Sequence, residues 1–185
     1  MDYNWKDLFN IIEKGQIPDI HLYMDQLTTF MEEKLSGYKR SPSDKIITKT
    51  MINNYTKDKI MPAPVKKKYS PEQLMLLIII FHLKPVLSIN DIGTMLNFIQ
   101  AEDIDIKDIY GVFTEIQKSQ EQAALYSAEK DKEIINKLMG ENDLNDGGDT
   151  AALLTALSLA VDATNKKNMA ERIIDDYLKN HQNAK

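Results

Sequence analysis

Apolar residues recur at helical spacing along most of this chain, and capping residues, glycines or prolines stand where one periodic stretch gives way to the next. The spacing predicts eight helices, over residues 3–14, 22–35, 48–59, 74–84, 89–96, 104–139, 150–163 and 169–180. The alternation of β-branched residues that marks strands is hard to find. We therefore expect an all-α fold.

The stretch 47–96 carries the clearest chemical pattern. Its first helix, 48–59, starts at a capping residue, Thr48, and has one narrow apolar face made of Met51, Ile52 and Tyr55. The opposite face is polar and cationic, with Lys49, Asn53, Asn54 and Lys57. Asn can bond to both N6 and N7 of adenine, and Lys can reach guanine or a phosphate. We predict that Lys49, Asn53 and Asn54 read DNA bases.

A basic turn follows this helix. Pro62 and Pro64 cannot continue the helix, so the chain must turn and expose an extended segment, 62–69, suited to phosphate contact. The predicted phosphate-binding residues are Thr48, Lys57, Lys66, Lys67, Lys68 and Tyr69. Ser70, Pro71 and Gln73 then form a strong helix start, which opens an apolar helix that we expect to be the buried centre of the domain.

The charge is divided unevenly along the chain. The formal net charge is −5, but residues 39–69 hold nine Lys or Arg and only two Asp, a local charge of +7 against −12 elsewhere. Screening limits distant charges to roughly 8 Å at physiological salt, so the local field matters most to a polyanion. The alternative is an ordinary solvated surface, and a run of three lysines alone would favour that alternative.

The order of these parts resembles the DNA-binding domain of the MerR family of transcriptional regulators. In that family a recognition helix is followed by a hydrophobic pair and proline, a short basic wing that ends in Tyr-Ser, and two further helices. The matching stretches here are residues 47–48, 52–55, 60–62, 69–70 and 87–92. Asn53, Asn54 and Lys59 depart from the usual residues, so the resemblance implies a winged helix-turn-helix domain but no base preference.

The chain also closely resembles an uncharacterised bacterial family known only as a domain of unknown function. The shared phrases are TKTMINNYTKDK and PVKKKYS, and the resemblance covers residues 22–139. We divide the chain into an N-terminal helix (1–20), a MerR-like, short-winged helix-turn-helix DNA-binding domain (21–100) and a helical dimerisation or accessory region (101–185).

The long helix 104–139 lies where MerR regulators carry their dimerisation helix, and an ordinary core helix is the alternative. Helix-turn-helix proteins gain affinity by reading two half-sites, so we expect a homodimer. Residues 140–149 form an acidic break that does not fit an EF-hand, because Leu144 and Leu153 fall on ligand positions.

Other functional classes find little support. The chain has no Cys, and its three His are isolated, with His82 on the apolar helix as a packed residue. We find no catalytic or metal-binding motif and expect neither an enzyme nor a cofactor. The longest apolar run is too short to span a bilayer, and the first residues do not read as a signal peptide, so we expect a cytoplasmic protein without membrane contact.

Two functions remain. The first is a sequence-specific transcriptional regulator that reads double-stranded DNA through helix 48–59 and the basic wing 62–69. The alternative is a helical protein–protein interaction module on a winged-helix scaffold without specific DNA binding. A small-molecule sensor has no sequence signature, so any effector is unknown.

Overall fold

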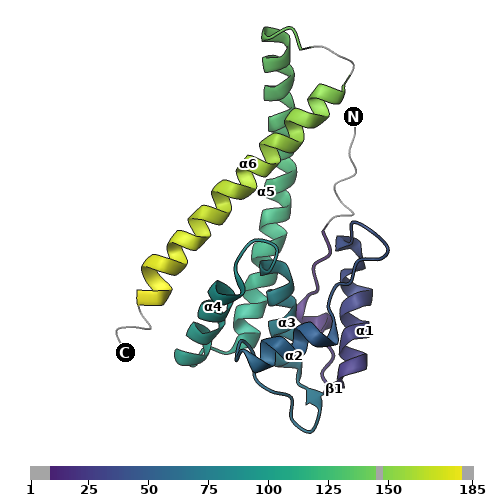
Figure 1. The fold of residues 1–185 in the computed structure, drawn as a ribbon, viewed down its shortest axis with the longest axis vertical. Coiled ribbons are helices and arrows are strands. Elements are labelled where there is room, and N and C mark those ends of the chain that lie inside the picture. The colour runs from purple at the N-terminus through teal and green to yellow at the C-terminus, as the bar shows by residue number, and fades with distance from the viewer. Residues whose placement is uncertain (1–8, 145–147, 181–185) are drawn as a thin grey trace.

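The computed structural model describes residues 9–144 and 148–180. These residues are mostly helical and include two short strands (Figure 1). The main elements are β1 (Leu22–Tyr23), α1 (Met24–Leu35), α2 (Lys49–Lys57), β2 (Lys68–Tyr69), α3 (Pro71–Leu83), α4 (Ile89–Ala101), α5 (Ile106–Glu141) and α6 (Asp149–Ile173). Short 3-10 turns lie at Lys14–Gln16 (η2) and Ser36–Tyr38 (η3), and a π-helical turn, Ile174–Lys179 (η4), extends α6. The expectation of a mostly helical, all-α fold class is confirmed.

Helix α3 is the centre of the core. Residues 73–80 are buried without interruption, which explains why this helix is apolar on every side. Its start is the predicted capping box: the Ser70 hydroxyl accepts from the Gln73 backbone N–H, and the Gln73 side chain accepts from the Ser70 N–H. Helices α1, α2, α4 and the first half of α5 contribute buried side chains to the same cluster.

The two strands form a small antiparallel sheet that ties the start of α1 to the start of α3. Leu22 lies opposite Tyr69, and Tyr23 lies opposite Lys68. Since successive residues of a strand face opposite sides, Leu22 and Tyr69 point into the core while Tyr23 is exposed.

The N-terminal segment differs from its prediction. Residues 9–13 form no helix and are followed only by the 3-10 turn η2, so a helix over 3–14 is wrong for this part; residues 1–8 lie outside the described residues. Ile12 is nevertheless buried in the core. Its carbonyl accepts a hydrogen bond from the Tyr110 hydroxyl at 2.6 Å, and the Asn10 N–H donates to the Tyr38 hydroxyl at 3.2 Å. Side chains from elsewhere in the fold thus satisfy backbone groups that a helix would pair internally.

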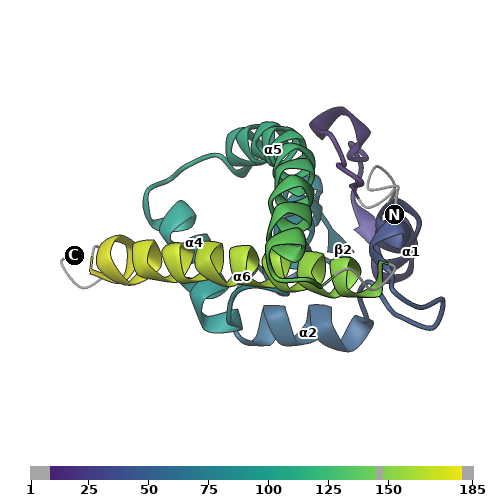
Figure 2. The same cartoon turned by 90° about the horizontal axis from the view of Figure 1, so that it is seen from above.

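The C-terminal region is a long helical hairpin. Helix α5 rises out of the domain, and α6 crosses it on the way back towards α4 (Figures 1 and 2). The two predicted helices 150–163 and 169–180 are one continuous helix, extended by η4. No Gly or Pro interrupts it, and ion pairs between Lys166 and Asp162 (2.8 Å) and between Lys167 and Glu171 (2.5 Å) span the polar stretch between the two predictions. No helix within the described ranges is long and apolar enough to cross a bilayer.

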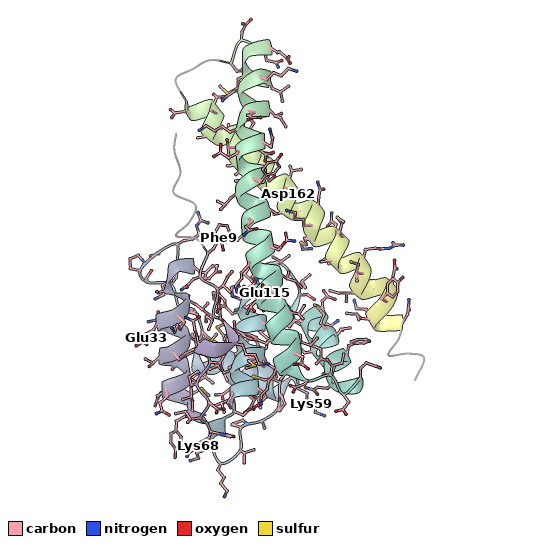
Figure 3. All side chains as sticks on the ribbon, turned by 180° about the vertical axis from the view of Figure 1, so that it is seen from behind. Phe9, Glu33, Lys59, Lys68, Glu115 and Asp162 are labelled. Carbon is pink, nitrogen blue, oxygen red and sulfur yellow. The ribbon has the colours of Figure 1, made fainter. Side chains whose placement is uncertain are left out.

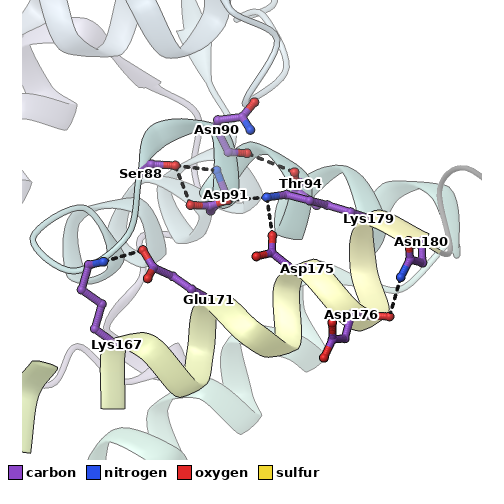
Figure 4. Close-up of polar contacts among 10 residues, drawn as sticks. All are labelled: Ser88, Asn90, Asp91, Thr94, Lys167, Glu171, Asp175, Asp176, Lys179 and Asn180. Atoms are coloured by element: carbon purple, nitrogen blue, oxygen red, sulfur yellow. Dashed lines mark hydrogen bonds and ion pairs between the residues drawn. The ribbon is translucent and has the colours of Figure 1, made fainter. Parts of the chain in front are cut away.

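The C-terminal end of α6, with η4, is anchored on α4. Ile174 is buried in the main core. The Lys179 ammonium lies 3.1 Å from Asp91 and 2.7 Å from Asp175 (Figure 4). Asp91 also accepts from the hydroxyl of Ser88, the residue that caps α4, at 2.6 Å, and these bonds lower the pKa of the Asp91 carboxyl. The hairpin is therefore fixed to the domain at both of its ends.

Candidate nucleic-acid interface

Helix α2 presents one polar face to solvent. Thr48 caps it, as predicted: its hydroxyl oxygen accepts from the Met51 N–H at 3.2 Å. Ile52 and Tyr55 are buried and hold the helix on the core. The helix ends at Lys57, because Lys59 adopts a left-handed backbone with a φ of 57°.

The predicted base-reading residues all lie on the exposed face of α2. Lys49, Asn53 and Lys57 repeat every four residues, so they form one row of about 12 Å along the helix, with Asn54 beside it. Lys49 also forms an ion pair with Asp25 of α1. Both of these side chains are largely exposed, so the pair contributes little to stability and Lys49 can exchange Asp25 for another anion.

A tight turn carries the charges of the basic segment. Val65 and Lys68 exchange two backbone hydrogen bonds of 3.0 Å, and the two residues between them, Lys66 and Lys67, have φ values of 49° and 63°. Positive φ at both central positions defines a type I′ turn. The predicted extended segment is thus a hairpin tip that exposes two adjacent ammonium groups.

The next two residues of the turn are less available. The Lys68 ammonium lies 4.9 Å from the centre of the Tyr23 ring, in a cation–π contact that leaves it half-buried. Tyr69 is only 3% exposed, and burial raises the pKa of its hydroxyl. The pairing of Tyr69 with Leu22 turns its ring into the core, and the predicted phosphate contact of its hydroxyl stays a prediction.

The turn is held rigidly against the domain. The Gln73 side chain, itself buried, donates from Nε2 to the Pro62 carbonyl at 2.7 Å and so joins the beginning of the turn to the first turn of α3. Helix α2 and the turn lie at the end of the molecule opposite the tip of the α5–α6 hairpin, as do the labelled Lys59 and Lys68 (Figures 1 and 3).

Further cations belong to the same region but were not predicted as site residues. Arg40 and Lys45, in the loop before α2, and Lys59, directly after it, are exposed. Lys39 instead pairs with Glu32, and this bond lowers the pKa of the Glu32 carboxyl. The sequence feature that could have indicated these residues is the local charge of +7 over residues 39–69. This sum includes them but does not show which of them are exposed beside α2.

The described residues contain no cluster of acidic or His side chains that could hold a metal ion. The candidate interface is thus a set of cations, amides and a capped helix, with the chemistry of anion and base-edge recognition.

Comparison with known proteins identifies one family. Residues 12–113 match the family described as Domain of unknown function (DUF1836). No curated protein and no solved structure matches the chain significantly. The matched region runs from the buried N-terminal segment through α1, α2, the basic turn, α3 and α4 into α5. It confirms the expected relationship to an uncharacterised family and lends no support to membership of the MerR family. Because the match covers more than half of its 185 residues, the chain belongs to the DUF1836 family.

Proposed function

We propose that this protein is a sequence-specific transcriptional regulator that binds double-stranded DNA as a homodimer. Helix α2 enters the major groove, where Lys49, Asn53 and Asn54 contact base edges. Lys57, Lys66 and Lys67 bind phosphates beside it. The Thr48 hydroxyl, whose oxygen already accepts from Met51, keeps its proton for a phosphate oxygen.

One observation carries this proposal. The exposed face of α2 carries amide and lysine side chains, and the rigid turn that follows it in the chain exposes two more lysines. Both lie at one end of the molecule, and the rest of the chain is acidic. A short helix of this kind fits the major groove, which is about 12 Å wide. Fixed cations beside it supply the sequence-independent part of the affinity.

The order of elements supports a winged helix-turn-helix of the MerR type. Helices α1 and α2 are followed by a proline-containing link, a basic turn that ends in Tyr69-Ser70, and then α3 and α4. In this arrangement the basic turn corresponds to the wing, shortened to a two-residue tip. The strand after the tip, β2, pairs with β1.

Selection of bound sequences from randomised duplex DNA at about 0.15 M salt tests the proposal, and it should enrich an inverted repeat. Asn53→Ala should change the preferred sequence, with a loss of about 1–3 kcal/mol at one base pair of each half-site. Equal losses on every duplex would refute a base-reading role for Asn53.

Lys67→Ala should weaken binding to all duplexes alike and flatten the slope of log K against log salt by roughly one unit. Lys137→Ala is the matched control, because Lys137 is an exposed lysine about one turn before the end of α5, and this end of α5 lies at the other end of the molecule from the turn. An effect of Lys137→Ala as large as that of Lys67→Ala would show that affinity follows total charge and not this interface.

The alternative, a protein-interaction module without specific DNA binding, is favoured by the exposed apolar side chains of α5 and α6. The affinity of the protein for duplex DNA distinguishes the two functions. A folded protein that binds no duplex more tightly than about micromolar at 0.1 M salt, within the range of non-specific binding, would favour the interaction module.

A further inference from the structure

The tip of the α5–α6 hairpin has an apolar surface that its own chain leaves uncovered. Residues 150–161 of α6 contain no charged side chain, yet no residue of α6 is buried. Exposed helices of globular proteins usually carry charges on their solvent side. Three turns without a charge therefore indicate a surface that is covered in the working molecule.

The exposed residues of this segment form a continuous ridge. Leu153, Leu157 and Val161 repeat every four residues and are 59%, 52% and 60% exposed. Ser158 and Leu154, on the neighbouring side of the helix, face α5.

Helix α5 continues this surface. Ile134 and Leu138 are about half exposed and lie beside Leu154 along a hollow of about 380 Å³. A second hollow of about 380 Å³ lies beside Leu157 and Val161. The two hollows share Asp131 and Ser158, which are joined by a hydrogen bond of 2.8 Å. We call this surface, made of Ile134, Leu138, Leu153, Leu157 and Val161, the hairpin face.

Charged residues beside the hairpin face are already satisfied within the chain. Lys130 pairs with Glu133 at 3.0 Å, Lys166 pairs with Asp162 at 2.8 Å, and Asp131 accepts from Ser158. The face therefore offers neither an excess of cations to a polyanion nor an excess of anions to a basic partner. Its chemistry fits a partner that is apolar in the middle and carries both signs of charge at the edge, as this face itself does.

We propose that the hairpin face binds the hairpin face of a second copy of this chain, so that α5 and α6 of both copies form an antiparallel four-helix bundle. Ridge and hollows lie side by side on one face. A twofold axis perpendicular to the hairpin face, offset from Asp131 so that the two Asp131 carboxylates do not meet, therefore places the ridge of each copy in the hollows of the other. Helical hairpins that cannot bury their own apolar surface associate in this way.

The size of the surface agrees with a dimer. Two adjacent helices about 20 Å wide, over the 16 residues from 127 to 142, give a footprint of roughly 500 Å². The accessible area of such a face exceeds its footprint because side chains protrude from it. Two such faces together reach about 1,000 Å², the lower bound for a specific interface.

The inference deepens the homodimer of the proposed function by assigning its interface to α6 and the distal part of α5. Light scattering coupled to size-exclusion chromatography tests it without DNA. The wild-type protein at about 10 μM should have twice the 21.2 kDa mass of one chain. Val161→Glu should place two buried, facing carboxylates in the bundle and weaken the dimer at least 100-fold, leaving a folded monomer by circular dichroism.

Val112→Glu is the matched control. Val112 is also a 60% exposed valine on a helix, but it lies about 28 Å along α5 from Asp131, near the domain. This variant should remain a dimer. A wild-type monomer at 100 μM would overturn the proposal, and so would a dimer that survives Val161→Glu or is lost in Val112→Glu.

A second measurement does not depend on disrupting the bundle. The chain has no Cys, so Leu153→Cys gives one labelling site per copy. Spin labels there should show one narrow intermolecular distance below about 30 Å, since both sites line a bundle of helices 10–12 Å in diameter. No measurable coupling would refute the interface. A dimer that binds no DNA would refute the proposed function alone. A monomer that selects a single half-site would refute the homodimer and its hairpin interface, and would leave sequence-specific DNA binding standing.

Discussion

At the scale of single residues, His82 is a half-buried ionisable group whose ring is surrounded by aromatic side chains. Its ring lies 5.1 Å from the ring of Tyr38, 5.2 Å from that of Phe81 and 5.8 Å from that of Phe113. Its Nε2 is buried without a hydrogen-bond partner among the described residues. Burial lowers the pKa of His82 to about 4, because this aromatic surrounding cannot solvate the imidazolium ion.

This low pKa predicts an acid-sensitive fold. The unfolded chain takes up a proton near pH 6.5, before the folded chain does, so this contribution to stability is complete above pH 6.5 and is lost as pH falls towards 4. At pH 4.5 the loss should be about 2–3 kcal/mol. Urea unfolding of the wild type and His82→Phe at pH 7 and pH 4.5 measures it. Between pH 7 and pH 4.5 the free energy of unfolding of His82→Phe should fall by this amount less than that of the wild type. An identical pH dependence in both proteins would contradict the prediction.

The turn at Lys66 and Lys67 offers a test in which stability and binding move in opposite directions. Lys is disfavoured in the left-handed region, whereas Asn-Gly is the preferred pair for a type I′ turn. Lys66→Asn with Lys67→Gly should raise the free energy of unfolding by about 1 kcal/mol. The same change should weaken DNA binding and flatten the salt slope by about two units. Unfolding in urea and DNA titrations at several salt concentrations give the two readouts, and unchanged DNA affinity would exclude the turn from the interface.

The orientation of the Tyr69 ring is a property of a single residue that the sequence alone does not predict. Composition and order correctly placed Lys49, Asn53 and Asn54 on an exposed face, since helical periodicity is local. The direction of the Tyr69 side chain depends instead on its register with Leu22, which lies 47 residues earlier in the chain. A slip of one residue would have exposed Tyr69 and buried Lys68.

At the scale of elements, the N-terminal segment depends on one buried hydrogen bond. The Tyr110 hydroxyl donates to the Ile12 carbonyl, and burial raises the pKa of that hydroxyl. Tyr110→Phe should destabilise the fold by about 1–3 kcal/mol, because the carbonyl is left buried and unpaired. Tyr126→Phe, the same change at an exposed position of α5, should have little effect in the same urea titration. Equal effects of the two substitutions would contradict this account.

Helix starts were predictable because caps are local. Ser70, Ser88 and Thr48 each accept a hydrogen bond from an N–H three residues later, as their positions suggested. The predicted N-terminal helix was wrong over residues 9–13, because partners far along the chain, Tyr38 and Tyr110, bind the backbone of this segment. The division of α6 was wrong for a different reason: polar residues can continue a helix when ion pairs at i and i+4 support it.

At the scale of the whole molecule, the basic interface and the hairpin face lie at opposite ends, with the core between them (Figure 1). The two proposed activities therefore use separate surfaces, and charge changes at one end are screened from the other beyond about 8 Å at physiological salt. Besides α5 itself, the anchor of α6 and η4 on α4 connects the hairpin back to the domain.

That anchor gives a prediction with a built-in control. Ile174 is 2% exposed and lies in the main core, whereas its neighbour Ile173 is 58% exposed. Ile174→Ala should cost about 2–4 kcal/mol in urea unfolding, because it removes buried methyl groups and leaves a cavity. Ile173→Ala should change the stability by less than about 0.5 kcal/mol. Hydrogen exchange should also show faster exchange in η4 and at Asp91 for the first variant only, since Lys179 can pair with Asp91 only while η4 is docked. Equal exchange in both variants would mean that the end of α6 is not anchored on α4 in solution.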